Sequence, residues 1–262
     1  MNLSKAARSI SLDESRNTSK LNAQEVEVKE LIEQQIVDMW LLFHAYYDDV
    51  EKNKFVSDLM EKDRVILLHD AKGQIQGFST IKCFNKAIDG KQTRIVYSGD
   101  TIINQTYWGQ TALQKAFYQF LFKEYLKHPF TPVYWFLISK GYKTYLLLSR
   151  NFKAYWPNYR KPTPEKEQQI IRFVAKEMFA SAWREESGTL EFDQPLGKLK
   201  QAISPITDEL LSHPEIKYFN DANPGHIDGN ELCCLGHVNT SLVVSYPFKL
   251  LRKAVLRLKI FR

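Results

Sequence analysis

The residues best suited to binding an anion lie in a short polar turn, NQTYWGQ, at 104–110. An apolar run ending in DTII precedes this turn, and apolar residues at helical spacing follow it: Leu113, Phe117, Phe120 and Leu121. A turn that leads into a helix leaves backbone N–H groups unpaired, and these groups attract an anion. Thr106 or Asn104 is expected to cap this helix. The stretch Arg94 to Leu121 is therefore predicted to be an anion-binding strand, turn and helix.

A second set of reactive side chains lies later in the chain: His226, Cys233, Cys234 and His237. Their spacing fits no zinc motif with paired ligands, and adjacent cysteines rarely bind one ion together. We therefore expect no metal site. The composition allows a cysteine nucleophile activated by His237, although no local sequence motif indicates one. The cysteines, with Cys83 as the third, form no disulfide framework, which favours a reducing compartment.

The composition predicts a folded protein with an anionic partner. The 262 residues are 44% hydrophobic and 13% aromatic, which allows a full core. The net charge of +6 and a pI near 9.0 suit a nucleotide-containing ligand, an acidic carrier protein, a membrane surface or nucleic acid. No recognition-helix pattern favours nucleic acid. Neither a signal peptide nor a run of roughly 18 to 20 apolar residues is present, so a cytoplasmic protein is expected.

The first half of the chain predicts two helices and a meander. Residues 1–24 are polar and are expected to form a mobile tail. Helices are predicted from Val26 to Tyr47 and from Lys54 to Glu61. The stretch RVILLHDAKGQIQGFSTIKCF predicts a hairpin, and the pair Asp89 and Gly90 predicts a second turn before the strand that begins at Arg94. These strands would form a three-strand meander.

The second half predicts a buried strand in PVYWFLISKG, then a helix that Pro157 ends. A charged connector with prolines, KPTPEKE, suggests a boundary between a core at 25–160 and an extension at 161–262. A helix is predicted from Glu165 to Arg184, loops at 186–230, and one or two strands from Leu232 to Val244.

The last residues, 247–262, are predicted to form a basic amphipathic helix. Its apolar side consists of Leu250, Leu251, Ala254, Val255, Leu258 and Phe261. Its basic side consists of Lys249, Arg252, Lys253, Arg257 and Lys259. Such a helix can lie at the inner surface of an anionic membrane, bind an acidic carrier protein, or pack on the domain with a solvated face.

The predicted order of elements resembles the core of the Gcn5-related N-acyltransferase (GNAT) superfamily across residues 28–160. RVILLHDAKGQIQGFSTI looks like the second and third strands of that family, with Gly77 at its glycine position. DTIINQTYWGQTALQKAFYQFL looks like the segment that binds the donor pyrophosphate, usually Arg/Gln-x-x-Gly-x-Gly/Ala. With Gly109 on the first glycine, Trp108, Thr111 and Leu113 stand where arginine and the later glycines are usual. Similar departures occur in acyl-homoserine-lactone synthases and N-acyl amino acid synthases, which use acyl carrier proteins.

The resemblance implies an α+β fold with a mixed central sheet flanked by helices, followed by a C-terminal extension. It implies an N-acyltransferase that moves an acyl group from acyl-CoA or an acyl carrier protein to a small-molecule amine, without a metal. The many aromatic residues at 134–159 suggest an acyl chain longer than acetyl. The alternative is a binding protein of the same fold that has lost catalysis and associates with a membrane surface.

Three side chains are candidates for catalysis under this resemblance. Asp100 would orient or deprotonate the amine, and the neighbouring Gly99 would permit a β-bulge that re-aims it. The alternative for Asp100 is a capping or turn carboxylate. Tyr142 and Tyr145 fall where the family often has the tyrosine that protonates the leaving thiolate, although tyrosines at helical spacing are also typical of a core.

The remaining candidates would bind the donor. Backbone N–H groups near Ile102 and Ile103 would hold the thioester oxygen and the pantetheine arm. The pyrophosphate would lie at the turn, against Trp108, Gly109, Gln110 and Thr111. Lys140, which follows Ser139, has two possible roles: it contacts a phosphate of the donor, or it is a solvated lysine at the end of a strand.

Overall fold

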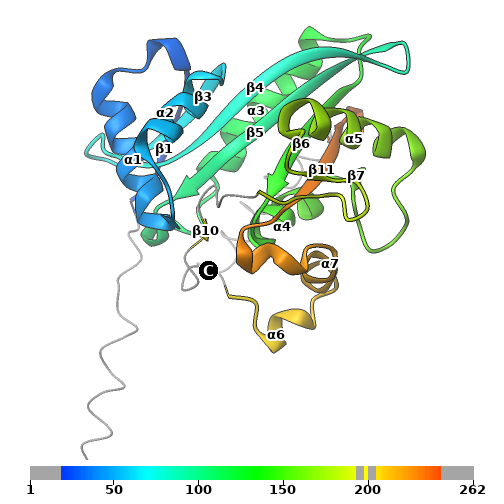
Figure 1. Ribbon diagram of the computed structural model, residues 1–262. Helices are drawn as coiled ribbons and strands as arrows, with labels where there is room; N and C mark the ends of the chain where they lie inside the picture. Colours follow the sequence, from blue (N-terminus) through cyan, green and yellow to red (C-terminus); the bar gives the residue numbers. More distant parts are fainter. Residues whose placement is uncertain (1–18, 193–197, 200–204, 243–262) are drawn as a thin grey trace, which may run out of the picture.

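The computed structural model describes residues 19–192, 198–199 and 205–242. Within them a nine-stranded sheet has the order β1-β3-β4-β5-β6-β11-β9-β8, with β7 pairing β11 beside this path (Figure 1). Its strands are β1 (Asn22–Glu27), β3 (Arg64–His69), β4 (Ile75–Ile88), β5 (Lys91–Ile103), β6 (Val133–Ser139), β7 (Tyr155–Trp156), β8 (Trp183–Arg184), β9 (Thr189–Leu190) and β11 (Glu231–Val238). A separate pair joins β2 (Tyr47–Asp48) to β10 (Lys198–Leu199). The main sheet is mixed, because β5 and β6 run parallel while its other neighbours are antiparallel.

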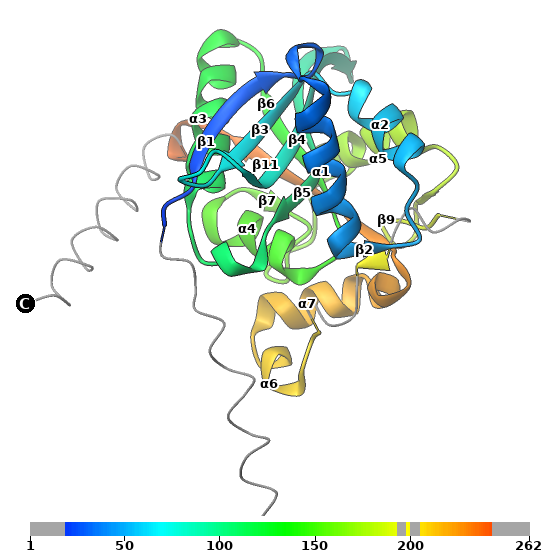
Figure 2. The ribbon, with the colours of Figure 1, turned by 90° about the vertical axis from the view of Figure 1, so that its left-hand side faces the viewer.

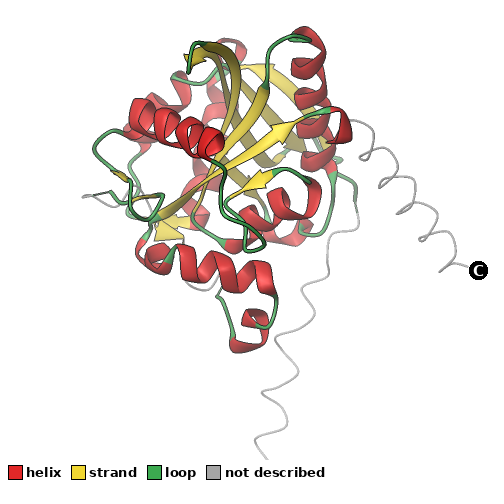
Figure 3. Cartoon of the chain, turned by 90° about the vertical axis from the view of Figure 1, so that its right-hand side faces the viewer, coloured by secondary structure: helices red, strands yellow, loops and turns green. Residues whose placement is uncertain are grey.

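Helices cover both faces of the sheet (Figures 2 and 3). One face packs against α1 (Glu33–Tyr46), α2 (Lys52–Met60) and α5 (Glu165–Phe179). The other packs against α3 (Ala112–Lys127), α4 (Tyr142–Asn151) and α7 (Pro214–Ala222), with the short α6 (Asp208–Leu211) beside α7. Large aliphatic and aromatic side chains are buried between the sheet and the helices on each face, and this burial drives the packing of the helices on the sheet. The expected α+β class with a mixed central sheet flanked by helices is confirmed.

Local turn chemistry sets the meander of β3, β4 and β5. Asp89 and Gly90 have φ values of 50° and 72°, as a two-residue hairpin turn between β4 and β5 requires. In the first hairpin the Asp70 carboxylate accepts hydrogen bonds from the N–H groups of Lys72 (2.8 Å) and Gln74 (3.0 Å). Both predicted turns are confirmed.

The N-terminal predictions need correction. Asn22 to Glu27 is strand β1 rather than tail and helix, because it pairs with β3 and the Arg64 guanidinium bonds both Glu25 (3.1 Å) and Glu27 (2.9 Å). A short 3₁₀ helix, Val28–Glu30, follows, and α1 begins only at Glu33. Long-range strand pairing here overrides the helical spacing of apolar residues. The rest of the predicted tail, 1–18, lies outside the described residues.

Later elements also differ from the predictions. The helix predicted to run to Pro157 ends at Asn151, because Tyr155 and Trp156 pair with β11 as β7. The next helix ends at Phe179 rather than Arg184, and Trp183 begins β8. The predicted loop region contains α6, α7 and the 3₁₀ helix Pro224–Asp228, and the strand after it is the single β11. The predicted helix at 247–262 lies outside the described residues.

The segment after 161 supplies β11, which lies next to β6 in the main sheet. The extension and the predicted core therefore share one sheet. None of the helices in the described part of the chain has both the length and the apolar character needed to cross a membrane.

Candidate active site

The parallel strands β5 and β6 diverge near the centre of the sheet. Their register runs from Arg94 opposite Val133 to Ser98 opposite Leu137, and then pairing stops. Both strands continue, each paired on its outer side: β5 with β4 to Ile103, and β6 with β11 to Ser139. Their facing edges beyond Ser98 therefore have no strand partner, and their backbone groups are available to a ligand.

A β-bulge lies at the point of divergence. Ser79 pairs with Thr101 and Ile81 with Ser98, so Gly99 and Asp100 both lie opposite Thr80. A Cβ on Gly99 would lie 2.7 Å from Thr80 Oγ1, so the bulge has room only for glycine. The extra residue places Asp100 on the same face as Ile102, the face covered by α1, α2 and α5. The predicted bulge at Gly99 is confirmed.

Asp100 is a partly buried carboxylate without a direct cationic partner. Among the described residues no side chain donates a hydrogen bond to it, and no cationic nitrogen lies within 4.0 Å. Burial raises its pKa, Lys140 and Lys62 oppose the rise from a distance, and Asp58 adds to it. An uncompensated carboxylate in such a position favours an incoming cation or proton.

Lys140 and Glu231 form an ion pair beside Asp100. Lys140 Nζ lies 3.4 Å from Glu231 Oε1, and the two side chains are 15% and 9% exposed. The same ammonium group lies 5.2 Å from the centroid of the Tyr47 ring. Burial raises the pKa of Glu231, Lys140 opposes the rise, and Asp100 adds to it. The two carboxylates therefore interact electrostatically, with Lys140 in contact with only one of them.

Lys62, on the link between α2 and β3, and Tyr97, on β5, lie near Asp100. Lys62 Nζ donates a hydrogen bond to the Asp58 carbonyl at 2.8 Å and lies 5.8 Å from the Tyr97 ring centroid. Burial lowers the pKa of Lys62 and raises that of Tyr97. We call Tyr47, Lys62, Tyr97, Asp100, Lys140 and Glu231 the Asp100 cluster.

Sequence reasoning identified Asp100 and considered Lys140, but it missed the other four members of the Asp100 cluster. These come from the end of α1, the link between α2 and β3, the middle of β5 and the start of β11. One signal was available, because Glu231 begins the apolar run ELCCLG, and a charge at the head of a buried strand needs a partner.

The polar turn between β5 and α3 differs from the expected cap. Asn104 Oδ1 accepts a hydrogen bond from Thr106 N at 3.2 Å and caps the 3₁₀ helix Gln105–Tyr107, not α3. Thr111 occupies the N-cap of α3 without a side-chain capping bond. Gly109, at φ 88°, allows the reversal between the two helices. Neither predicted cap of α3 is therefore correct.

Two predicted donor-binding side chains already have partners. Trp108 Nε1 donates to the Ile103 carbonyl (2.8 Å), which ties the turn to the end of β5. Gln110 donates to Ser19 O (2.8 Å) and accepts from Leu21 N (3.0 Å), so its amide holds the N-terminal segment.

The other predicted donor-binding residues supply mainly backbone. Ile102 is buried against α1 and α2, and Ile103 pairs with Gly77. Gly109 and Thr111 border the turn, whose Trp108 ring has Lys143 Nζ 3.7 Å from its centroid. Donor binding at these positions stays a prediction.

The predicted catalytic tyrosines face the α3/α4/α7 core, away from Asp100. Tyr142 is 9% exposed at the start of α4. The Tyr145 hydroxyl lies 3.1 Å from both Glu215 Oε2 and the Pro157 carbonyl, and the Tyr155 hydroxyl donates to Glu215 Oε1 at 2.5 Å. Burial raises the pKa of Tyr145. Proton donation by either predicted tyrosine stays a prediction.

The reactive residues of the C-terminal part are dispersed. Cys233 and Cys234 are buried on opposite faces of β11. His237 stacks on Tyr134 with centroids 4.7 Å apart, and His226 lies 5.5 Å from the Phe219 ring. No group of three or more metal-binding side chains occurs among the residues that the structure describes.

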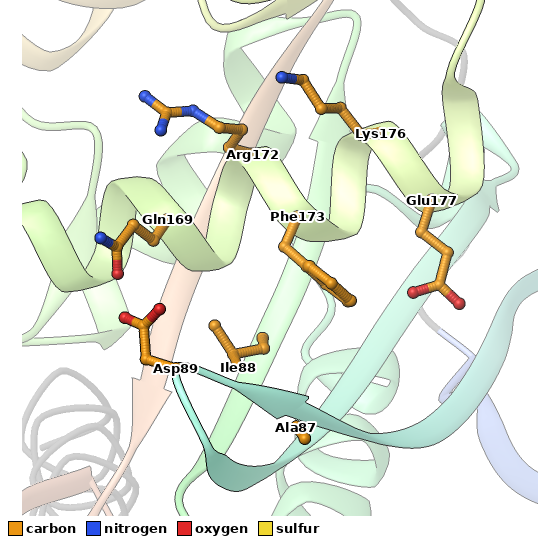
Figure 4. Close-up of a pocket in the computed structure, with 8 residues that line it drawn as sticks. All are labelled: Ala87, Ile88, Asp89, Gln169, Arg172, Phe173, Lys176 and Glu177. Carbon is orange, nitrogen blue, oxygen red and sulfur yellow. The ribbon is translucent and has the colours of Figure 1, made fainter.

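A pocket of about 620 Å³ lies between the β4–β5 hairpin tip and α5 (Figure 4). Phe173 points toward Ile88, while Arg172 and Lys176 point away from the hairpin and pair with Glu185 at 2.6 and 2.7 Å. Asp100 lies toward the opposite end of β5. The pocket is therefore separate from the Asp100 cluster.

No protein-family model matches the sequence, and no curated protein is similar to it. Solved structures are similar over about half of the chain. A probable N-acyltransferase from Enterococcus faecalis is 11% identical with a TM-score of 0.39, and the match covers 51% of this chain and 33% of that one. A GNAT family N-acetyltransferase from Escherichia coli, solved with CoA, is 16% identical with a TM-score of 0.36, covering 53% and 77%. ElaA from Escherichia coli is 18% identical with a TM-score of 0.36, covering 56% and 95%. The chain thus spans a third of the first protein's length, and the first two of these proteins, both at low identity, carry the names of acyltransferases.

Proposed function

We propose that this chain is an N-acyltransferase that moves an acyl group from a thioester of CoA or an acyl carrier protein to an amine. One observation carries the proposal: a carboxylate without a paired cation, Asp100, lies on a bulge where the two parallel strands of the sheet diverge. The divergence offers backbone edges to an extended donor arm, and the carboxylate offers an acceptor for a proton.

The chemistry needs few groups. The amine arrives as an ammonium ion and pairs with Asp100, which takes one proton from it, and the neutral nitrogen then attacks the thioester carbon. A backbone N–H group near Ile102 or Ile103 donates to the developing oxyanion. The new C–N bond forms as the C–S bond breaks, and the departing thiolate takes up the second proton that the nitrogen loses. Asp100 is suited to this because burial has already raised its pKa.

The donor arm would lie along the facing edges of β5 and β6, with its phosphates at the start of α3. The N–H groups of the first turn of α3 precede the first helical hydrogen bond, from Lys115 N to Thr111 O (3.0 Å), and are available to an anion. Lys143, beside Trp108, adds a positive charge near this turn. The net charge of +6 suits a CoA ester as well as an acidic carrier protein.

A second candidate is a protein that binds a thioester or lipid without catalysis. The engagement of Gln110 by Ser19 and Leu21 favours it, because the N-terminal segment then occupies a side chain that would otherwise face a donor.

The test is thiol release from acetyl-, octanoyl- and palmitoyl-CoA and from an acylated carrier protein, with and without a panel of amines. We expect thiol release that depends on the amine, an N-acyl product in the mass spectrum, and a preference for acyl chains longer than acetyl. A donor that raises the melting temperature without turnover would favour the non-catalytic candidate. Neither stabilisation nor turnover with any donor would refute both.

A further inference from the structure

Lys140 lies between two carboxylates but touches only one. Its Nζ is 3.4 Å from Glu231 Oε1, whereas no cationic nitrogen of the described chain lies within 4.0 Å of the Asp100 carboxylate. The positive charge of Lys140 nevertheless lowers the pKa of Asp100, against the stronger effect of burial, which raises it. The lysine therefore acts on Asp100 through space, without a direct ion pair.

Strand register explains this separation. The last β5–β6 pair is Ser98 and Leu137, so Asp100 lies two residues beyond it on β5, and Lys140 lies three residues beyond it, directly after the end of β6. On the other side of β6, Leu232 pairs with Ser139, which brings Glu231 next to Lys140. Strand β11 thus anchors the lysine on the side away from Asp100.

We propose that Lys140 is a positioning residue for acyl transfer, held by Glu231 and Tyr47 at a distance where it keeps Asp100 ionised and leaves that carboxylate free for the acceptor amine. This proposal rests on the proposed function of the Asp100 cluster. A lysine paired directly with Asp100 would stabilise the same charge but would occupy the oxygens that the amine needs.

Several other groups face Asp100. Lys62, after α2, attracts its charge, while Asp58 on α2 repels it. Glu231 on β11 and the two tyrosines, Tyr47 and Tyr97, also lie near Asp100, and Asp100 raises the pKa of all three. With Lys140 removed, Lys62 would be the remaining cation among these groups.

Two substitutions should shift the acidic limb of the kcat/KM profile in opposite directions. Lys140→Met should move the limb up by about one pH unit, because an attractive charge is lost. Glu231→Gln should move it down and raise KM for the amine, because a repelling negative charge is lost and Lys140, no longer paired with Glu231, can approach Asp100. A merely structural ion pair would lower activity in both variants without moving the limb, and that result would overturn the proposal.

A substrate-free measurement separates this proposal from the proposed function. We would follow the Asp100 carboxyl carbon by ¹³C NMR through a pH titration, assigned with Asp100→Asn. The Asp100 titration midpoint should shift up in Lys140→Met and down in Glu231→Gln even without substrate. If these shifts occur in a protein that transfers no acyl group, the electrostatic role of Lys140 is supported and the acyltransferase function is refuted.

Two further variants serve as controls for the role of Lys140. Lys140→Met with Glu231→Gln removes both members of the ion pair, so that neither is left without the other, and it should still raise the Asp100 titration midpoint. Lys86→Met breaks an ion pair with Glu177 on the surface and should leave the midpoint unchanged. An Asp100 midpoint that stays the same in all Lys140 and Glu231 variants would contradict the proposal.

Discussion

Asp100 occupies a position that favours chemistry over stability. A partly buried carboxylate without a paired cation destabilises the folded chain, and most folded proteins avoid this arrangement. Its raised pKa means that the folded state binds the proton more tightly than the unfolded state does. Ionisation of Asp100 therefore lowers stability above the raised pKa, and this penalty disappears as the pH falls below the ordinary pKa of aspartate, about 3.9.

Asp100→Asn should therefore raise the melting temperature at neutral pH, by the equivalent of about 1 kcal/mol for each unit of pKa shift. The gain should shrink as the pH falls toward about 4, where the wild-type carboxyl is protonated. Thermal unfolding of both proteins across this range measures the difference. A variant less stable than the wild type at neutral pH would show that Asp100 has a structural role.

Tyr145 tests the assignment of roles on the opposite face of the sheet. Tyr145→Phe removes the hydroxyl that lies 3.1 Å from Glu215 and from the Pro157 carbonyl, and it should lower the free energy of unfolding by about 1–3 kcal/mol. Turnover per folded molecule should stay near the wild-type value, as in Tyr142→Phe. Denaturant unfolding and thiol release on the same samples check both points. Lost turnover with retained stability would instead make Tyr145 the proton donor to the thiolate.

At the scale of elements, the bulge determines where Asp100 points. Gly99→Ala would place a methyl group 2.7 Å from Thr80 Oγ1 and 3.3 Å from Lys62 Cε, and the β4–β5 pairing would have to shift. We expect a loss of about 1–3 kcal/mol in stability, as for overpacking, together with loss of turnover. Thr80→Ala in the same chain removes the nearest contact and should restore part of the stability. Unchanged activity in Gly99→Ala alone would show that the bulge does not position Asp100.

The sequence predicted elements wherever local chemistry decides them. Asp89 and Gly90 require a tight turn, and the change from strand to helical spacing around Gly109 marks the start of α3. Strands β1 and β7 were missed because pairing with β3 and β11 decides them, and no local pattern reports such a distant partner.

The residues of the candidate site also divide into those that a local pattern indicates and those that only the sheet brings together. Asp100 was predictable because Gly99 sits beside it in a strand, whereas Lys62 and Glu231 join it only through the sheet. Gln110 was predicted to bind a donor phosphate, and in the structure its amide bonds to Ser19 and Leu21. These residues are far from Gln110 in the sequence, so no local pattern indicates the contact.

At the scale of the whole molecule, the site depends on both halves of the chain. The link between α2 and β3 supplies Lys62, β5 supplies Asp100, and the segment after 161 supplies Glu231 through β11. A chain cut at the predicted boundary would therefore lose the strand that anchors Lys140. The whole sheet is the unit that forms the site.

Membrane association is a prediction from the sequence of residues 247–262. The five residues on the basic side of the predicted helix would each contribute about 1 kcal/mol near an anionic surface. The full chain should co-sediment with phosphatidylserine liposomes more strongly than a chain ending at Tyr246, and the difference should fall as salt rises. Equal sedimentation of both chains would end the membrane hypothesis.

The most direct test of acyl transfer at the diverging strands compares two identical chemical changes on the β4–β5 ribbon. Asp100→Asn removes the proposed base, and Asp89→Asn alters the hairpin turn at the other end, where asparagine tolerates the positive φ. With the best donor and amine, Asp100→Asn should lower kcat/KM by about 10²-fold or more, while Asp89→Asn stays near the wild type. Full activity in Asp100→Asn would contradict the account.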